Sequence, residues 1–301
     1  MNFNGIISAM VTPMTKDQEV NEAVSRQLTD HLIRSGIHGI FILGTNGEFH
    51  VLTPEEKVTL ARCVVDEVKG RVPVIVGTGA NSTKETIEMS LKMEEEGVDA
   101  LSVITPYFIA PTQKEIVQHY ERIAVSTILP ILIYNIPSRT GVDLEEETVA
   151  ELAKIPNIAG IKDSSGRFEN IKQYIKVTQK EDFSVLAGTD SLILSTLQAG
   201  GTGAIASTSN MLPELVVSIY NSWKEGNEEE ARRAQDNLQP LRDTFGYGTL
   251  PSVLKKAVEL YGIPVGPPRA PVSELNGEAL EKVKEMVAYY KGVSAEGVFR
   301  G

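Results

Sequence analysis

The sequence has one cysteine and four histidines in 301 residues. A single cysteine excludes an internal disulfide, and Cys63 falls in a stretch with helical periodicity, which predicts a position in the packed core. The histidines, His31, His38, His50 and His119, show neither HxH nor HExxH spacing. We therefore expect no metal site and no cofactor.

Clusters of basic residues and long apolar runs are also missing. The formal net charge is −11, which disfavours binding to nucleic acid or to an anionic membrane surface. No segment reaches the roughly 20 apolar residues needed to span a bilayer, and the first residues lack the pattern of a signal peptide. We expect a cytoplasmic protein with a small-molecule substrate. Local positive groups must attract any anionic substrate, because the overall charge repels it.

Several motifs of nucleotide-binding and hydrolytic enzymes are absent. The turn after the first expected strand reads TPMTKDQ and contains no glycine, so the dinucleotide-binding fingerprint is missing. The GxxxxGK[ST] phosphate loop is missing as well, and no GxSxG motif or Cys/His pairing indicates a hydrolase.

Short apolar runs instead alternate with segments of helical periodicity. This alternation predicts an α/β fold of parallel βαβ units, and eight units predict a closed (β/α)8 TIM barrel rather than an open doubly wound sheet. The expected strands cover residues 5–11, 39–43, 73–76, 100–104, 130–134, 158–162, 184–187 and 203–206. The helices expected between them include residues 54–68, 83–95, 113–126 and 144–153.

The chain continues as helix beyond the eighth unit. The expected helices are residues 228–243, 250–261 and 278–290. The PVGPPRAP segment at 264–271 predicts a rigid loop, because each proline fixes its own φ and restricts the preceding residue. We predict one domain, divided into a barrel at 1–225, a C-terminal helical extension at 226–293 and a flexible tail at 294–301.

The reactive groups of such a barrel lie at the C-terminal ends of its strands. Lys162 ends the strand IAGIK and Tyr134 ends the neighbouring ILIYN, so we expect both side chains side by side in the barrel mouth. Schiff-base lysines react in the neutral form, which desolvation favours, and a phenol can relay protons. The alternatives are a lysine that reaches water and a tyrosine that caps the core.

The GTNGE turn after the second strand contains Gly44 and Gly47. Backbone N–H groups left open by these glycines would suit a carboxylate, and the alternative is a plain tight turn. Thr45 can bridge to Tyr134 through its hydroxyl.

Four motifs, GTNGE, GTGANST, YNIPSRTG and GIKDSSG, together resemble the dihydrodipicolinate synthase/N-acetylneuraminate lyase family. The resemblance extends from about residue 3 to 290, in the family's order and spacing. It implies a class I pyruvate lyase that forms a Schiff base and assembles as a homotetramer, a dimer of dimers.

The resemblance also implies roles for individual residues. It makes Lys162 the Schiff-base lysine, Tyr134 the proton-transfer tyrosine and Thr45 the relay hydroxyl. The loop amides at Thr45 and Asn46 would bind the pyruvate carboxylate, and the backbone carbonyl of Ile205 in GAIAS would face bound pyruvate. Arg139 in PSRTG resembles the arginine that receives the second substrate's carboxylate, and a surface arginine is the alternative. Around these residues the predicted site includes Gly44, Gly47, Glu48, Tyr107, Phe108 and Gly188.

The sequence departs from the synthase pattern at three places. Asn46 replaces the second threonine of GTTGE, and TLPSVLKK at 249–256 replaces NPIPVK. Phe108 replaces the second tyrosine of TPYY. The resemblance implies that, in the family, this tyrosine extends into the site of a neighbouring subunit and supplies a relay hydroxyl there. The activity therefore stays open between condensation of pyruvate with aspartate semialdehyde, which Arg139 favours, and an aldolase, which the departures favour. The aldolase would cleave 4-hydroxy-2-oxoglutarate or a 2-oxo-3-deoxy sugar acid. A non-catalytic 2-oxo acid sensor is a remote alternative.

Overall fold

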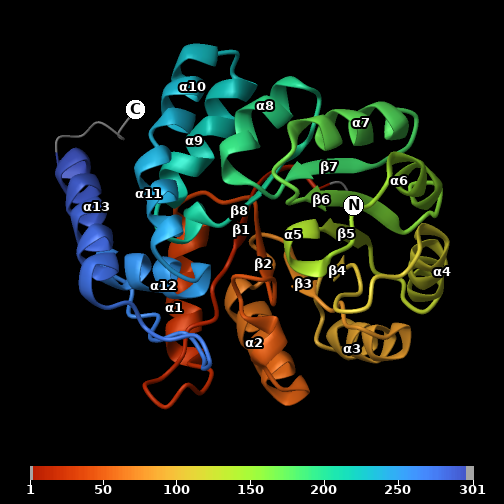
Figure 1. The fold of residues 1–301 in the computed structure, drawn as a ribbon, viewed down its shortest axis with the longest axis horizontal. Coiled ribbons are helices and arrows are strands. Elements are labelled where there is room, and N and C mark those ends of the chain that lie inside the picture. Colours follow the sequence, from red (N-terminus) through yellow and green to blue (C-terminus); the bar gives the residue numbers. More distant parts are fainter. Residues whose placement is uncertain (1–2, 296–301) are drawn as a thin grey trace.

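The computed structural model describes residues 3–295, and within them eight parallel strands close into a barrel in the order β1 to β8 (Figure 1). This confirms the predicted fold. The strands are β1 (Gly5–Ala9), β2 (Gly39–Ile42), β3 (Val74–Gly77), β4 (Ala100–Ile104), β5 (Ile131–Asn135), β6 (Ile158–Asp163), β7 (Ser184–Ala187) and β8 (Gly203–Ala206). The first and last strands pair to close the sheet, with Ile7 opposite Ile205.

Helices surround the barrel on the outside. They are α1 (Glu22–Arg34), α2 (Pro54–Val68), α3 (Thr83–Glu95), α4 (Gln113–Ala124), α5 (Pro137–Thr140), α6 (Glu146–Leu152), α7 (Phe168–Thr178), α8 (Ile193–Gln198) and α9 (Pro213–Lys224), with 3₁₀ turns η1 (Phe49–Val51), η2 (Asp190–Leu192) and η3 (Thr208–Asn210). Thr53 and Thr112 each form a capping box at the start of α2 and α4, which satisfies backbone donors that a helix start leaves free.

The strands are buried on both faces, because their side chains alternate between two packing layers. One layer fills the barrel interior and contains apolar residues such as Phe41, Leu132 and Ile205. The other layer lies between the strands and the helices. Cys63 of α2 is buried as predicted, and its Sγ donates to the carbonyl of Glu22 in α1. The barrel interior is therefore a packed core rather than an open channel.

The C-terminal extension stands beside the barrel (Figure 1). It consists of α10 (Glu228–Asp236), α11 (Gln239–Thr244), the 3₁₀ turn η4 (Phe245–Tyr247), α12 (Leu250–Tyr261) and α13 (Gly277–Ala295). The single helix predicted at 228–243 is wrong, because the chain breaks after Asp236 and restarts with Pro240 in the first turn of α11. Proline has no backbone N–H and is tolerated only in that first turn.

Other predicted bounds shift by smaller amounts. The first strand was expected at 5–11 but ends at Ala9, because the N–H of Val11 donates to the side chain of Asn210 at 2.9 Å. Helix α13 was expected to end at Tyr290 and continues to Ala295. Residues 294 and 295 of the predicted tail thus belong to this helix, and residues 296–301 lie outside the described part.

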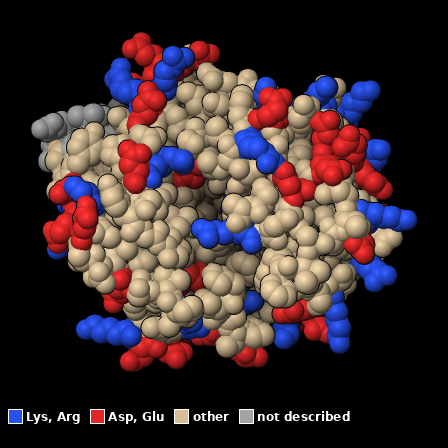
Figure 2. All heavy atoms as spheres, viewed as in Figure 1, with Lys and Arg blue, Asp and Glu red and all other residues tan. Residues whose placement is uncertain are grey.

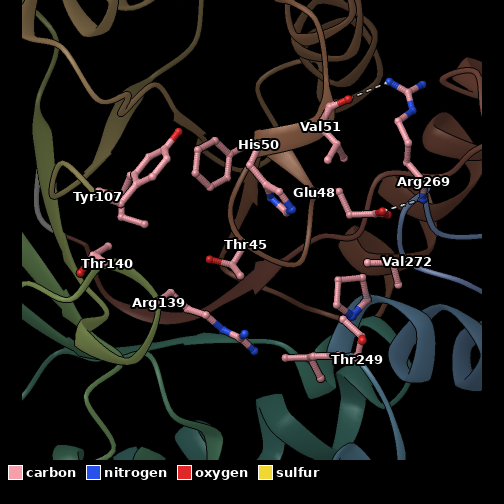
Figure 3. Close-up of a pocket in the computed structure, with 14 residues that line it drawn as sticks. Thr45, Glu48, His50, Val51, Tyr107, Arg139, Thr140, Thr249, Arg269 and Val272 are labelled. Atoms are coloured by element: carbon pink, nitrogen blue, oxygen red, sulfur yellow. Dashed lines mark hydrogen bonds between the residues drawn. The ribbon is translucent and has the colours of Figure 1, made fainter. Parts of the chain in front are cut away.

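A buried joint connects the extension to the loop after β2. We use this name for Glu48, Lys255, Pro267 and Arg269. The Nζ of Lys255 donates to Glu48 Oε1 and to the carbonyl of Pro267, both at 2.7 Å. The backbone N–H of Arg269 donates to Glu48 Oε2 at 2.8 Å (Figure 3). The extension thus fixes the GTNGE loop at its last residue.

Candidate active site

The C-terminal ends of the strands surround a cavity of about 250 Å³. Its lining includes the predicted residues Gly44, Thr45, Asn46, Gly47, Tyr134, Arg139, Lys162, Gly188 and Ile205. These residues come from five different strands or the loops after them, so the barrel assembles what the sequence separates. Figure 2 shows this region hollowed near the centre of the face, with basic side chains beside the hollow.

Lys162 and Tyr134 lie side by side, because they are opposite one another in the β5–β6 register. Lys162 is only 4% exposed. Its Nζ lies 4.0 Å from the centre of the Tyr134 ring and 4.8 Å from that of Phe41. No ion pair involves Lys162 within residues 3–295. The rings of Tyr134 and Phe41 therefore shield the amine from water, and the amine faces the cavity without a carboxylate partner among the described residues.

The hydroxyl of Tyr134 has a partner in the loop after β2. Thr45 Oγ1 lies 3.1 Å from Tyr134 Oη, and either atom can be the donor. A hydroxyl pair of this kind can pass a proton between a reacting group beside the amine and the outer part of the cavity. The expected contact between these two side chains is thus present.

The GTNGE loop turns sharply without using a left-handed backbone at its glycines. The left-handed residues are Leu43 and Glu48, with φ of 57° and 56°. Gly44 is needed for space, because a Cβ there would lie 2.4 Å from Cε1 of Phe41. Thr12 Oγ1 donates to the carbonyl of Gly47 at 2.7 Å and holds the far side of the loop.

Gly188, directly after β7, makes room for the lysine. A Cβ at this residue would lie 3.0 Å from Cε of Lys162 and 2.1 Å from Oγ of Ser164. Its backbone N–H donates to the carbonyl of Asp163 at 2.7 Å. Any side chain at position 188 would therefore displace the amine or the loop after β6.

A polar cluster behind the reactive pair was missed by the sequence interpretation. Asn135 and Asp163 form the next register pair beyond Tyr134 and Lys162, and Asn135 Nδ2 donates to Asp163 Oδ1 at 2.8 Å. Burial raises the pKa of Asp163, although hydrogen bonds from Ser165 and Asn135 counter it. The signal was available, since each residue directly follows a predicted reactive residue. The cluster fixes the two strand ends at the site.

A second cavity of about 270 Å³ adjoins the first one and shares Thr45, Arg139 and Leu250 with it (Figure 3). Arg139, exposed on the short helix α5, lies at the boundary between the two. Tyr107 lines the second cavity, as does Glu48, whose carboxylate is bonded within the buried joint. These two predicted residues thus lie near the site but away from Lys162.

Phe108 is placed differently from the other predicted residues. Its side chain is 91% exposed, its φ is 77°, and it lines neither cavity of its own chain. The structure of one chain therefore does not bring Phe108 to Lys162.

Two charged residues that line the first cavity, Asp190 and Arg242, were missed by the sequence interpretation. Asp190 accepts hydrogen bonds from the N–H and hydroxyl of Ser207 and from the N–H of Thr208. Arg242 comes from α11 in the extension, and no motif signals that α11 reaches the barrel mouth.

Two kinds of feature, a metal-binding cluster and a membrane-spanning helix, are absent from the described residues. Between residues 3 and 295, no three His, Cys, Asp or Glu side chains are grouped so that they could hold a metal ion. No helix in the same part of the chain has the length and apolar character needed to cross a membrane.

Comparison with known proteins shows the family to which the chain is similar. Residues 2–289 match the sequence model of the "Dihydrodipicolinate synthetase family". A 4-hydroxy-tetrahydrodipicolinate synthase of Methanopyrus kandleri is 41% identical over 95% of this chain and 94% of its own length.

Solved structures show the same likeness. That of the 4-hydroxy-tetrahydrodipicolinate synthase of Methylacidiphilum fumariolicum SolV has a TM-score of 0.94 at 34% identity, with 99% of each chain covered. A prophage protein of E. coli K12 from the dihydrodipicolinic acid synthase family, solved in complex with pyruvate, has a TM-score of 0.92 at 32% identity, covering 96% of this chain and 99% of that one.

Proposed function

Because the chain belongs to the dihydrodipicolinate synthetase family and is a lyase of its Schiff-base class, we propose that Lys162 binds pyruvate as an imine. The observation that carries this proposal is the position of the amine. Lys162 is buried, lies against two aromatic rings and faces a cavity without a carboxylate partner. The pyruvate complex of the E. coli relative supports the choice of oxo acid.

The chemistry follows from the contacts around the amine. Neutral Lys162 Nζ adds to C2 of pyruvate, the oxygen at C2 takes a proton from Tyr134 Oη, and the nitrogen returns a proton to the phenolate to give a carbinolamine. A second proton from the phenol lets that oxygen leave as water and leaves the protonated imine, and Thr45, 3.1 Å from Tyr134, then resupplies the phenolate with a proton. Loss of a proton from C3 gives an enamine. Its C3 then forms a bond to the carbonyl carbon of an aldehyde, whose oxygen takes up a proton as its π bond to carbon breaks. The imine that results is hydrolysed by water, which releases the product and the free lysine.

The pyruvate carboxylate binds to the loop at Thr45 and Asn46, with the carbonyl of Ile205 facing the bound pyruvate. Both loop residues are half-buried and line the cavity of Lys162. Arg139 receives a carboxylate on the second substrate, because it lies at the outer boundary of that cavity and forms no ion pair within the described residues. Guanidinium groups bind carboxylates through paired hydrogen bonds.

The first candidate reaction is condensation of pyruvate with aspartate semialdehyde. The names of the relatives favour it, since those at 35–41% identity are called 4-hydroxy-tetrahydrodipicolinate synthase. The second candidate is reversible aldol cleavage of a hydroxylated 2-oxo acid. Phe108 favours this candidate, because a phenyl ring neither donates nor accepts a proton where the synthase pattern has a hydroxyl.

Covalent capture tests the imine. Pyruvate with borohydride should attach one reduced pyruvyl group to Lys162 and abolish activity, as located by peptide mass spectrometry. Lys162→Arg keeps the charge and should form no adduct. Labelling of another lysine, or turnover without any label, would overturn the proposal. Assays of both candidate reactions under identical conditions decide between them.

We also propose that the chain assembles as a homotetramer in the cytoplasm. The assembly is supported by exposed apolar side chains at Phe108, Ile109, Val125 and Ile128, since apolar surface of this kind is typical of subunit contacts. Light scattering coupled to size-exclusion chromatography measures the mass in solution, and a monomer at micromolar concentration would contradict the assembly. The cytoplasmic location stays a prediction.

A further inference from the structure

Arg242 is a charged residue of the Lys162 cavity that the pyruvate chemistry does not use. It belongs to α11 in the C-terminal extension and lines the same cavity as Lys162 and Tyr134. Phe245 and Leu250 of the same part of the chain also line this cavity. The extension therefore contributes a cation to a cavity whose other charged lining residues, Arg139, Lys162 and Asp190, come from the barrel.

The guanidinium of Arg242 has no partner among the described residues. Three arginines of residues 3–295 are half-buried, and the other two form ion pairs, Arg26 with Asp66 and Arg269 with Glu56. Arg242 forms none, and its inaccessible Nε has no hydrogen-bond partner within those residues. Its own helix offers no acid at positions 238, 239, 245 or 246, where a helical ion pair would need one.

A partly buried guanidinium without a partner is unfavourable, so it calls for a physical explanation. The acids of the two cavities do not supply one. Asp190 accepts three hydrogen bonds from the loop after β8. Glu48 is bonded to Lys255 and to the N–H of Arg269. A bound anion explains the position of Arg242 best.

The two arginines of the site, Arg139 and Arg242, belong to different elements and differ in the cavities that they border. Arg139 comes from α5 and borders both cavities, whereas Arg242 comes from α11 and borders only the first. In Figure 1, α5 lies over the mouth of the barrel and α11 stands to its left. The two guanidinium groups thus reach the cavity from two separate elements, so each can bind an anionic group of its own.

We propose that Arg242 binds a second acidic group on the aldehyde partner, so that the preferred acceptor carries two anionic groups and no ammonium group. This inference rests on the proposed pyruvate chemistry at Lys162. Two guanidinium groups beside a cavity of about 250 Å³ attract carboxylates and repel an ammonium, and both effects are strengthened by partial exclusion of water. An acceptor of this class differs from aspartate semialdehyde, which carries an amino group.

Binding of simple acids to the trapped enzyme tests the proposal. Reduction with pyruvate and borohydride fills the pyruvate position, and calorimetric titration then compares malonate, succinate and glutarate with propionate, butyrate and pentanoate, respectively. At least one dicarboxylate should bind about tenfold tighter than the monocarboxylate of equal length, because it gains a second charge-assisted contact. Arg242→Gln should remove this advantage, and Arg242→Lys should retain part of it.

Arg233→Gln is the matched control, since it removes the same charge from an exposed arginine of α10 that pairs with Glu229 and Glu230. It should keep the dicarboxylate preference. The proposal is wrong if the wild type shows no preference, or if Arg242→Gln retains it while the adduct on Lys162 forms normally. If no adduct forms, the imine proposal fails, and the same titration of the untreated enzyme still decides the role of Arg242.

Discussion

Two lysines are buried among the described residues, and their surroundings differ in one decisive respect. Lys255 donates to the carboxylate of Glu48 at 2.7 Å, and both side chains are 1% exposed. Burial lowers the pKa of Lys255, and the charge of Glu48 counters this shift. Lys162 instead has aromatic rings as neighbours and a cavity in front of it. Burial alone thus does not distinguish the two lysines. The lack of a carboxylate partner among the described residues and the adjoining cavity do distinguish them, and both features support the role proposed for Lys162.

The largest effect is expected at the hydroxyl beside Lys162. Tyr134→Phe keeps the ring against the amine and removes the proton donor, so the rate of pyruvate imine formation should fall by about 10²–10⁴-fold. Rapid quenching with borohydride measures that rate. Tyr120→Phe is the control, because this buried phenol donates to the backbone carbonyl of Val103 and lies outside the site. A loss below about threefold in Tyr134→Phe would assign the phenol to packing.

Substitutions in the buried joint should lower the free energy of unfolding, whereas their effect on imine formation should be smaller. Lys255→Met leaves the Glu48 carboxylate buried without its ammonium, so the free energy of unfolding should fall by about 3–5 kcal/mol, as measured in urea. Lys162→Met leaves no carboxylate behind and should change it by less than about 1.5 kcal/mol. Adding Glu48→Gln to Lys255→Met should restore part of the loss. Equal destabilisation at both lysines would remove the distinction between them.

Substitution of Arg139 tests whether binding of the acceptor aldehyde is independent of imine formation at Lys162. Arg139→Ala should raise the KM of the acceptor by about 10- to 150-fold, which corresponds to one lost charge-assisted contact of about 1.5–3 kcal/mol. Pyruvate trapping on Lys162 should stay nearly unchanged. Arg122→Ala removes an exposed arginine of α4 and should affect neither step. Equal damage to trapping and to acceptor binding would indicate a structural arginine.

The smallest effect is expected at Phe108. Phe108→Tyr, alone or with Asn46→Thr, should improve condensation with aspartate semialdehyde by a few-fold to about tenfold, because it restores a hydroxyl to the relay. Initial rates of condensation and of aldol cleavage are compared under the same conditions. Ile109→Tyr adds a phenol at the neighbouring exposed position and should not help. A wild type that already reaches a kcat/KM of about 10⁴ M⁻¹s⁻¹ with aspartate semialdehyde would decide for condensation over aldol cleavage.

The sequence predicted the barrel and the reactive pair for the same reason. Strand ends meet at one edge of a parallel barrel, so Tyr134 and Lys162 could be placed together from local patterns alone. The contact of Lys255 with Glu48 spans 207 positions, and no periodicity encodes it. Arg242 was missed because its role depends on where α11 packs. Local patterns predict elements, and side-chain contacts between distant elements require the assembled structure.

The buried joint also determines at which stage of synthesis the site of a new chain can be completed. Lys162 and Tyr134 are already synthesised when the eighth strand leaves the ribosome, but Lys255, Arg269 and Arg242 are not. Until α12 docks, the Glu48 carboxylate at the end of the GTNGE loop lacks the ammonium that compensates it. The last residue of the GTNGE loop therefore gains its partners, and the Lys162 cavity gains Arg242, only in the final stage of translation.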